Sequence, residues 1–383
     1  MRIAILVVVA SLLGVIGWSY MTALTASGQS SFGVRTVEWI RGHGGASVVR
    51  EIENVYYSMN APKKGGAPPK GALTPPVSGK AEKSNGQTSS TAIPNHLTPP
   101  SPIRPIASPP LPGEGKWTPE GNLIDGMPGV YVTLMRPDAI HTSLVAGVAW
   151  MDPHLVSFLQ FAGGQQPPTG GPWPYSSPIP ASLTPSLVAA FNSGFRMQDA
   201  HGGYYAYGKT AVPLVNGAAS FVIYNNGTVN IVNWGRDQKM APNVAVVRQN
   251  LQLIVDGGKV NPAVYSQNYL QWGQTVGNAV LVWRSGAGIT ANGAVVYAAG
   301  PGLSVASLAE LLVRAGAVRG MELDINSTWV DYFYFNQQPG TPASAASGTR
   351  LVYNMERPPQ RYFEGTARDF VAVFARPAPL SYR

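Results

Sequence analysis

The chain has 383 residues, of which 43 are Gly, 34 are Pro and only 12% are charged. So much Gly and Pro argues against a helical bundle and favours a protein of strands and turns with a Pro-rich linker. The formal net charge is +8, and residues 1–118 carry +6 of it while residues 119–383 carry +2. A globular part that is nearly neutral excludes a basic footprint for nucleic acid.

An apolar run occupies residues 3–24, directly behind Met1 and Arg2. About 20 such residues are long enough to cross a bilayer as a helix. A cleaved signal peptide is the alternative, but small residues three apart do not mark a cleavage site here. We expect residues 1–24 to be a single-pass anchor in the cell membrane. Because Arg2 keeps the N-terminus inside, the C-terminal domain would be extracytoplasmic, or secreted if the segment is cleaved.

Two segments follow before the domain begins. Residues 25–59 are predicted to be a juxtamembrane helical segment, because Val48, Ile52, Val55 and Tyr56 follow the spacing of one apolar helical stripe. Residues 60–116 are rich in Pro, Gly, Ser and Lys and have few large apolar residues. Such a composition cannot offset its ordering entropy by burial, so we predict a linker.

Residues 117–383 are predicted to form one domain of many short strands. Asn225-Asn226-Gly227 and Asn292-Gly293 are hairpin signals between strand-like runs. One helix is expected over Val305 to Ala315, with Ser304 as its N-cap and Gly316 after its end. Many strands and few helices predict an α+β fold with a large mixed, mostly antiparallel β-sheet core, preceded by a transmembrane helix and a Pro-rich linker.

The stretch from Met321 to Asn326 alternates strictly between apolar and polar residues. A period of two is typical of a strand with one face on the core. Glu322 and Asp324 would then project to the same side, about 6.6 Å apart. Two acids on one strand face of such a charge-poor chain favour a functional site, although a solvated sheet face is the alternative.

A second informative stretch, residues 191–208, gathers hydrogen-bonding side chains among glycines and aromatic residues. Glycine lets the backbone approach a ligand closely, and an aromatic ring beside donors suits a sugar ring. The alternative is a turn-rich hairpin with surface tyrosines. The candidate substrate-binding residues of this stretch are Asn192, Gly194, Arg196, Asp199, His201 and Tyr204.

Arg284 ends an apolar strand and precedes Ser285-Gly286. Its planar fork could bind a phosphate or carboxylate, or it could pair with Glu322 or Asp324 as structural support. The five histidines show no metal-ligand spacing, so we predict no metal site and no cofactor. A divalent cation such as calcium is left open.

Taken in order, these stretches resemble the phosphodiester glycosidase family. The family has an Asn-Gly-Gly-Phe-like segment, an Arg-Thr-x-x-Gly strand, a helix, and Leu-Asp-Gly-Gly-Gly-Ser. The counterparts within residues 125–376 are Asn192-Ser193-Gly194-Phe195, then Arg284-Ser285-Gly286-Ala287-Gly288, the helix from Val305, and Leu323-Asp324-Ile325-Asn326-Ser327. With its anchor and linker, the layout resembles an actinobacterial membrane-anchored branch of that family.

The resemblance implies hydrolysis of a sugar-1-phosphodiester bond in an envelope glycan or glycoconjugate. It implies base or nucleophile roles for Glu322 and Asp324, phosphate binding by Arg284 and Arg196, and sugar binding by Asn192 and Asn326. Ser327 is a further candidate substrate-binding residue. Ser193, Ile325 and Asn326 stand where the family has glycines.

A non-catalytic glycan- or cell-wall-binding module is the alternative function, in which the same acids bind hydroxyls. The predicted partners are a glycan or sugar-phosphate substrate and the membrane, through residues 3–24. No nucleic acid is expected.

Overall fold

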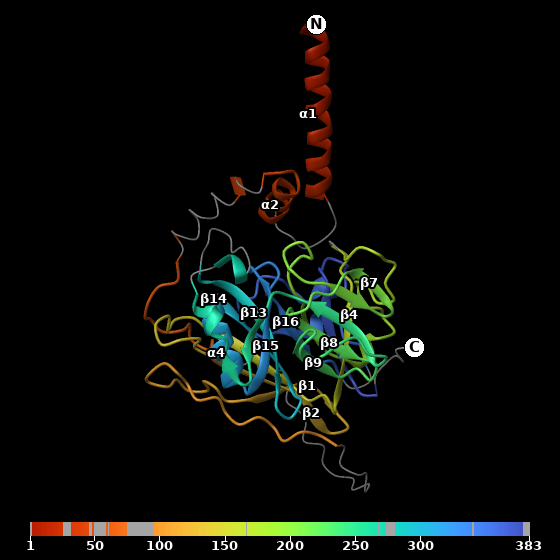
Figure 1. The fold of residues 1–383 in the computed structure, drawn as a ribbon. Coiled ribbons are helices and arrows are strands. Elements are labelled where there is room, and N and C mark those ends of the chain that lie inside the picture. Colours follow the sequence, from red (N-terminus) through yellow and green to blue (C-terminus); the bar gives the residue numbers. More distant parts are fainter. Residues whose placement is uncertain are drawn as a thin grey trace. The chain divides into compact units, whose positions relative to one another are not determined.

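The computed structural model describes residues 2–25, 32–45, 48–49, 59, 61–74, 95–165, 167–266, 269–272, 280–338 and 341–377. The chain divides into two compact units, one of residues 1–60 and 276–279 and the other of residues 61–275 and 280–383 (Figure 1). The second unit contains all the strands and the candidate site.

The first unit contains the helices α1 (Arg2–Thr25) and α2 (Phe32–Gly42). The rings of Tyr20 and Trp39 lie 5.0 Å apart, and the Tyr20 hydroxyl lies 2.9 Å from Thr36 Oγ1. These contacts join the two helices. Within the described part of the chain, no helix combines the length and the apolarity that crossing a bilayer requires.

Part of the predicted juxtamembrane stripe, Ile52, Val55 and Tyr56, lies outside the described residues, as do residues 75–94 of the predicted linker. Residues 61–74 are described and belong to the second unit.

Residues 95–116 of the predicted linker also belong to the second unit. Glu114 accepts hydrogen bonds from Arg136 Nε at 3.0 Å and Nη2 at 2.7 Å, and both side chains are buried. Arg136 also donates to the carbonyl oxygens of Ala107 and Pro109, at 3.0 and 2.7 Å. A buried cation thus satisfies two backbone carbonyls of this segment, and the buried Ile103 side chain packs in a core cluster.

Replacing Glu114 by Gln is expected to lower the free energy of unfolding by about 2 kcal/mol, because a buried hydrogen bond between charged groups is lost. Burial raises the pKa of Glu114, but the hydrogen bonds from Arg136 outweigh burial and the pKa lies below its ordinary value. The stabilisation is therefore present at neutral pH and is lost as the pH falls through the lowered pKa. Urea denaturation of both proteins at neutral and acidic pH checks this, and equal stabilities at neutral pH would contradict it.

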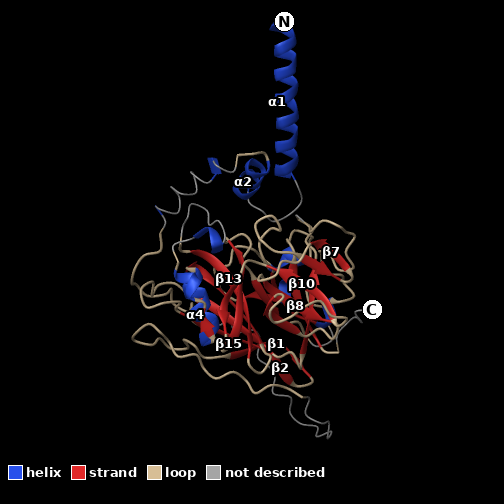
Figure 2. Ribbon diagram, viewed as in Figure 1, coloured by secondary structure: helices blue, strands red, loops and turns tan. Residues whose placement is uncertain are grey.

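The described strands of the second unit, red in Figure 2, form three sheets, and every pair of named strands in them is antiparallel. The first sheet has the order β1 (Thr118–Ile124), β2 (Met127–Met135), β3 (Ala146–Met151), β14 (Val295–Leu303), β13 (Val282–Thr290), β15 (Ala317–Ile325), β11 (Leu253–Asp256), β12 (Lys259–Val260). The second has the order β7 (Lys209–Val212), β6 (Tyr204–Ala206), β10 (Val244–Gln249), β8 (Ala219–Tyr224), β9 (Val229–Asn233). The third has the order β17 (Gly348–Arg350), β16 (Tyr332–Phe335), β5 (Leu187–Asn192), β18 (Phe370–Ala375), β4 (Val156–Phe161).

The prediction of a mostly antiparallel fold with few helices is confirmed, whereas the structure has three antiparallel sheets in place of one mixed sheet. Besides α4 (Val305–Arg314), the described helical elements of the second unit are single 3₁₀ turns: Thr184–Ser186, Pro262–Tyr265, Tyr269–Trp272, Ala345–Ser347 and Pro359–Tyr362.

The three sheets meet in one apolar core. Phe191 of β5 packs on Phe221 of β8 and on Tyr297 of β14, with ring centroids 6.4 and 5.1 Å apart. All three side chains are buried, so each sheet contributes to the same core cluster. This shared core fixes the ends of β5, β13 and β15 relative to one another.

The predicted helix is present as α4, which covers the other face of the first sheet (Figure 2). Ser304 and Ser307 form a capping box at its start, and Gly316 follows its end with φ +92°. A Cβ atom on Gly286 would lie 3.2 Å from the Leu308 side chain, so glycine lets α4 approach β13 closely. Both predicted hairpins are also present, between β8 and β9 and between β13 and β14.

Candidate active site

A β-bulge changes the direction of the side chains in the part of β15 that contains Glu322 and Asp324. Arg284 of β13 lies opposite Ile325, while Gly286 lies opposite Glu322, so two residues of β15 face a single residue of β13. Such a bulge bends the strand and commonly redirects a side chain beside an active site. The strict alternation predicted from the sequence is therefore interrupted before Asp324.

Asp324 lines a small pocket at the end of β15. The lining residues are Asn192, Ser193, Asp324, Trp329, Arg361, Tyr362, Ala367, Arg368, Asp369 and Phe370.

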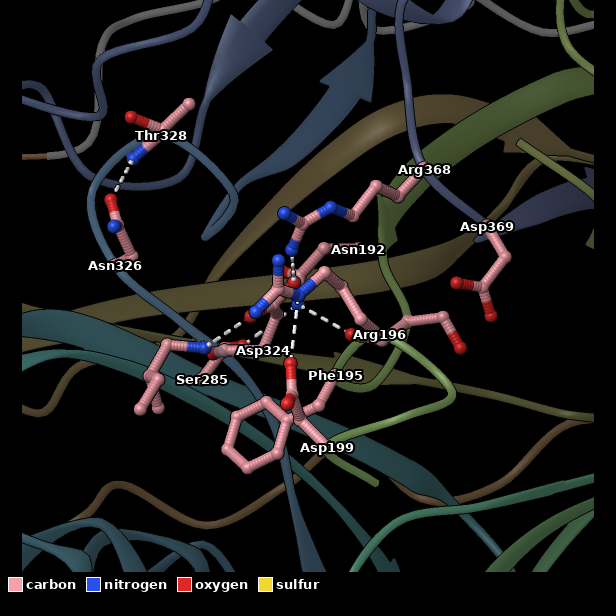
Figure 3. Close-up of polar contacts among 12 residues, drawn as sticks. Asn192, Phe195, Arg196, Asp199, Ser285, Asp324, Asn326, Thr328, Arg368 and Asp369 are labelled. Carbon is pink, nitrogen blue, oxygen red and sulfur yellow. Dashed lines mark hydrogen bonds and ion pairs between the residues drawn. The ribbon is translucent and has the colours of Figure 1, made fainter. Parts of the chain in front are cut away.

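The carboxylate of Asp324 is almost fully buried. Its Oδ1 accepts a hydrogen bond from the Ile325 amide at 2.8 Å, and its Oδ2 accepts one from Arg368 Nη1 at 3.1 Å (Figure 3). Burial raises the pKa of Asp324 to about 6, although Arg368 opposes the rise. With this pKa the carboxylate is mostly ionised at neutral pH and can accept a proton.

Glu322 is fully buried and is not among the residues that line the pocket. Its Oε1 accepts a hydrogen bond from Arg284 Nη1, and its Oε2 has no hydrogen-bond partner among the described residues. Burial raises the pKa of Glu322 to about 7, against the effect of Arg284. Arg284 also donates to the carbonyl oxygen of Leu303 at 3.0 Å. The Arg284–Glu322 pair is thus a buried support of the sheet in this structure.

A second carboxylate, Asp369, lines the same pocket. It accepts hydrogen bonds from Arg248 Nε at 2.7 Å and from Gln160 Nε2 at 3.2 Å. The backbone of Ser193 lies between the two acids, because its N–H donates to the Asp369 carbonyl at 3.2 Å and its carbonyl accepts from the Asp324 N–H at 3.0 Å. The segment predicted from the sequence as a binding loop therefore sets the spacing of the two acids.

Three arginines surround Trp329 beside this pocket. The guanidinium carbons of Arg368, Arg361 and Arg357 lie 3.7, 5.2 and 5.8 Å from the ring centroid. All four side chains are largely buried. Cation–π attraction of this kind strengthens when the cation is removed from water.

Arg361 is held by a buried acid. Its Nη1 donates to Asp331 Oδ2 and to the Thr328 carbonyl oxygen, the latter at 3.0 Å, and the Tyr362 hydroxyl donates to Asp331 Oδ1. Burial raises the pKa of Asp331, against the effect of Arg361. Both pocket-lining side chains, Arg361 and Tyr362, are therefore fixed from behind by one carboxylate.

The structure brings only part of the predicted binding stretch to the pocket. Asn192 lines it, but its Nδ2 donates to Ser285 Oγ at 2.9 Å and its Oδ1 accepts from the Tyr297 hydroxyl at 2.8 Å. Gly194 serves close packing, because a Cβ there would lie 3.0 Å from the Asn250 side chain.

The other members of that stretch do not line the pocket. Arg196 Nε donates to Asp199 Oδ2 at 2.7 Å, and both side chains are partly exposed (Figure 3). His201 is exposed and has φ +49°. Tyr204 lies in the core, with its ring 5.4 Å from that of Trp173. In this arrangement the Tyr204 ring is not available as a surface for a sugar.

The chain turns sharply after Ile325 although the glycines of the family pattern are absent. Asn326 has φ +94°, a conformation that favours glycine and that asparagine tolerates better than most residues. Its Oδ1 accepts from the Thr328 amide at 3.0 Å, which stabilises the turn. Ser327, on the exposed side of the turn, donates to Glu356 Oε2 at 2.8 Å.

Sequence reasoning missed Arg361, Arg368, Asp331 and Asp369. One signal was present: residues 350–368 contain four arginines in a chain of low charge content. Among the described residues, no group of three or more His, Cys, Asp or Glu side chains could hold a metal ion.

The chain matches no protein-family model and no curated protein. Solved structures to which the chain is similar include the catalytic domain of zebrafish N-acetylglucosamine-1-phosphodiester alpha-N-acetylglucosaminidase, auto-inhibited by its pro-peptide. It is 15% identical with a TM-score of 0.42, and the match covers 68% of this chain and 87% of that chain. A hypothetical protein from Synechocystis is 12% identical with a TM-score of 0.34, covering 68% of this chain and 64% of that one.

Proposed function

We propose that this chain is a glycosidase that hydrolyses a sugar-1-phosphodiester bond, with Asp324 as its base or nucleophile. The observation that carries the proposal is the pocket itself, in which a buried carboxylate of raised pKa lies beside two arginines, Arg361 and Arg368. The four family-like motifs, in the family's order, support the same reaction.

The pocket offers what this reaction needs. Phosphate is a good leaving group, so the main requirements are stabilisation of an oxocarbenium-like sugar and of the charge on the departing phosphate. An ionised Asp324 serves the first requirement or activates a water molecule. Arg368, hydrogen-bonded to Asp324, is placed to serve the second because it contacts the base from the pocket side.

We also propose that the apolar run of residues 3–24 anchors the chain in the cell membrane and that the second unit acts outside the cytoplasm on an envelope glycan or glycoconjugate. The support is the sequence: a long apolar run behind Arg2, with few charges before residue 35.

The full-length chain should be incubated with a panel of sugar-1-phosphodiesters and with matched glycosides that lack the phosphate. We expect release of free sugar together with a phosphomonoester, and little turnover of the matched glycosides. Binding of sugar phosphates without turnover across the panel would contradict the proposal and identify a glycan-binding module.

The pH dependence of turnover follows from the raised pKa of Asp324. Because the ionised form is the active one, kcat/KM should fall about tenfold per pH unit below the pKa of about 6 and level off above it. Measuring kcat/KM between pH 4 and pH 8 tests this. A profile that stays flat from pH 4 to pH 7 would show that Asp324 is not the titrating group.

A further inference from the structure

We infer that Arg361 and Arg368, stacked on Trp329, form the phosphate-binding element of this site, and that Arg284 and Arg196 do not. The inference rests on the proposed function and adds to it the residues that would hold the anionic part of the substrate. It also predicts that free inorganic phosphate binds at the same place.

Arg361 has a donor that the protein leaves unused. The side chain is 3% exposed and lines the pocket, and its Nη1 is occupied by Asp331 and the Thr328 carbonyl oxygen. Its Nε is buried and has no hydrogen-bond partner among the described residues. A buried charged donor without an acceptor is costly, so the geometry fits an anion that supplies the missing oxygen.

Arg368 lies between the position proposed for the anion and Asp324, the proposed base. Its guanidinium lies 3.7 Å from the centroid of the Trp329 ring, and its Nη1 donates to Asp324 at 3.1 Å. Stacking on a ring fixes the plane of a guanidinium, and a planar guanidinium matches the oxygens of a phosphate. An anion bound there lies next to the carboxylate that acts on the sugar.

The two arginines predicted from the sequence are engaged elsewhere. Arg284 donates to Glu322 and to the Leu303 carbonyl oxygen, and Arg196 pairs with Asp199 on a partly exposed loop. Neither is among the residues that line the pocket.

Isothermal titration of the full-length chain with inorganic phosphate, at constant ionic strength, tests the inference. We expect Arg361→Gln to weaken phosphate binding by about tenfold or more, because a charge-assisted bond is lost. Arg361→Lys keeps the charge beside Asp331, so the variant should stay folded. It lacks the planar guanidinium, so it should still bind phosphate more weakly than the wild type. Arg236→Gln is the matched control, because Arg236 is half-exposed and, among the described residues, pairs with the surface acids Asp237 and Asp256.

Wild-type phosphate affinity in a folded Arg361→Lys protein, or no binding of phosphate to the wild type, would overturn the inference. Turnover is measured separately on the same proteins. Turnover without Arg361-dependent phosphate binding would refute the phosphate element alone, whereas phosphate binding without turnover of any diester would refute the proposed enzyme activity alone.

Discussion

Asp324→Asn should lower kcat by about 10²- to 10⁴-fold, because the amide cannot accept the proton or attack the sugar. The change keeps the size of the side chain, and the amide oxygen can still accept from the Ile325 N–H, now 2.8 Å from Oδ1. We therefore expect the variant to fold, and turnover of the best diester of the panel at neutral pH, with the melting temperature beside it, measures the effect.

A surface carboxylate provides the control for this change. Asp256 is ion-paired with Arg236 at the end of β11 and is partly exposed. Asp256→Asn should therefore keep wild-type turnover. If a folded Asp324→Asn protein kept more than a tenth of the wild-type kcat, the role assigned to Asp324 would be wrong.

Asp331→Asn should lower the free energy of unfolding by about 3 to 5 kcal/mol, because it leaves the buried guanidinium of Arg361 without its counter-charge. Asp331 is fully buried and receives both Arg361 and the Tyr362 hydroxyl, so solvent cannot replace the lost interactions. Urea denaturation monitored by circular dichroism gives the difference.

The double variant Asp331→Asn/Arg361→Met also removes the Arg361 guanidinium, which the single variant leaves buried without a counter-charge. It should recover a large part of the lost stability, because replacing a whole buried pair is far less costly than breaking it. If Asp331→Asn alone lowered the free energy of unfolding by less than 1 kcal/mol, the stabilising role assigned to the Asp331–Arg361 pair would be wrong.

The sequence was sufficient where the structure depends on neighbouring residues. The Ser304 cap and Gly316 stop of α4 are local signals, and so are the Asn-Gly turns of the two hairpins. Each satisfies or releases the backbone within a few residues, so no knowledge of the rest of the fold is needed.

The bulge in β15 could not be predicted in the same way. It arises from the pairing of Ile325 with Arg284 and of Glu322 with Gly286, residues that lie about 40 positions apart in the chain. Tyr204 shows the same limit, because the residue pattern does not reveal that its ring packs in the core and away from the pocket.

The missed half of the site comes from an irregular segment. Arg361 and Arg368 lie between the short strand β17 and the last strand β18, where no helical or strand period draws attention to them. Their arrangement depends on the approach of Trp329 and Asp331 from the turn after β15. Only the density of arginine in a charge-poor chain marked the segment.

Hydrolysis in water enriched in ¹⁸O would decide which bond is broken. A glycosidase cleaves the bond between the anomeric carbon and the phosphate oxygen, so we predict that the released phosphomonoester contains no ¹⁸O and that water oxygen enters the sugar. Mass spectrometry of the phosphomonoester gives the result. Incorporation of ¹⁸O into the phosphate would show attack at phosphorus and would contradict a glycosidase role for Asp324.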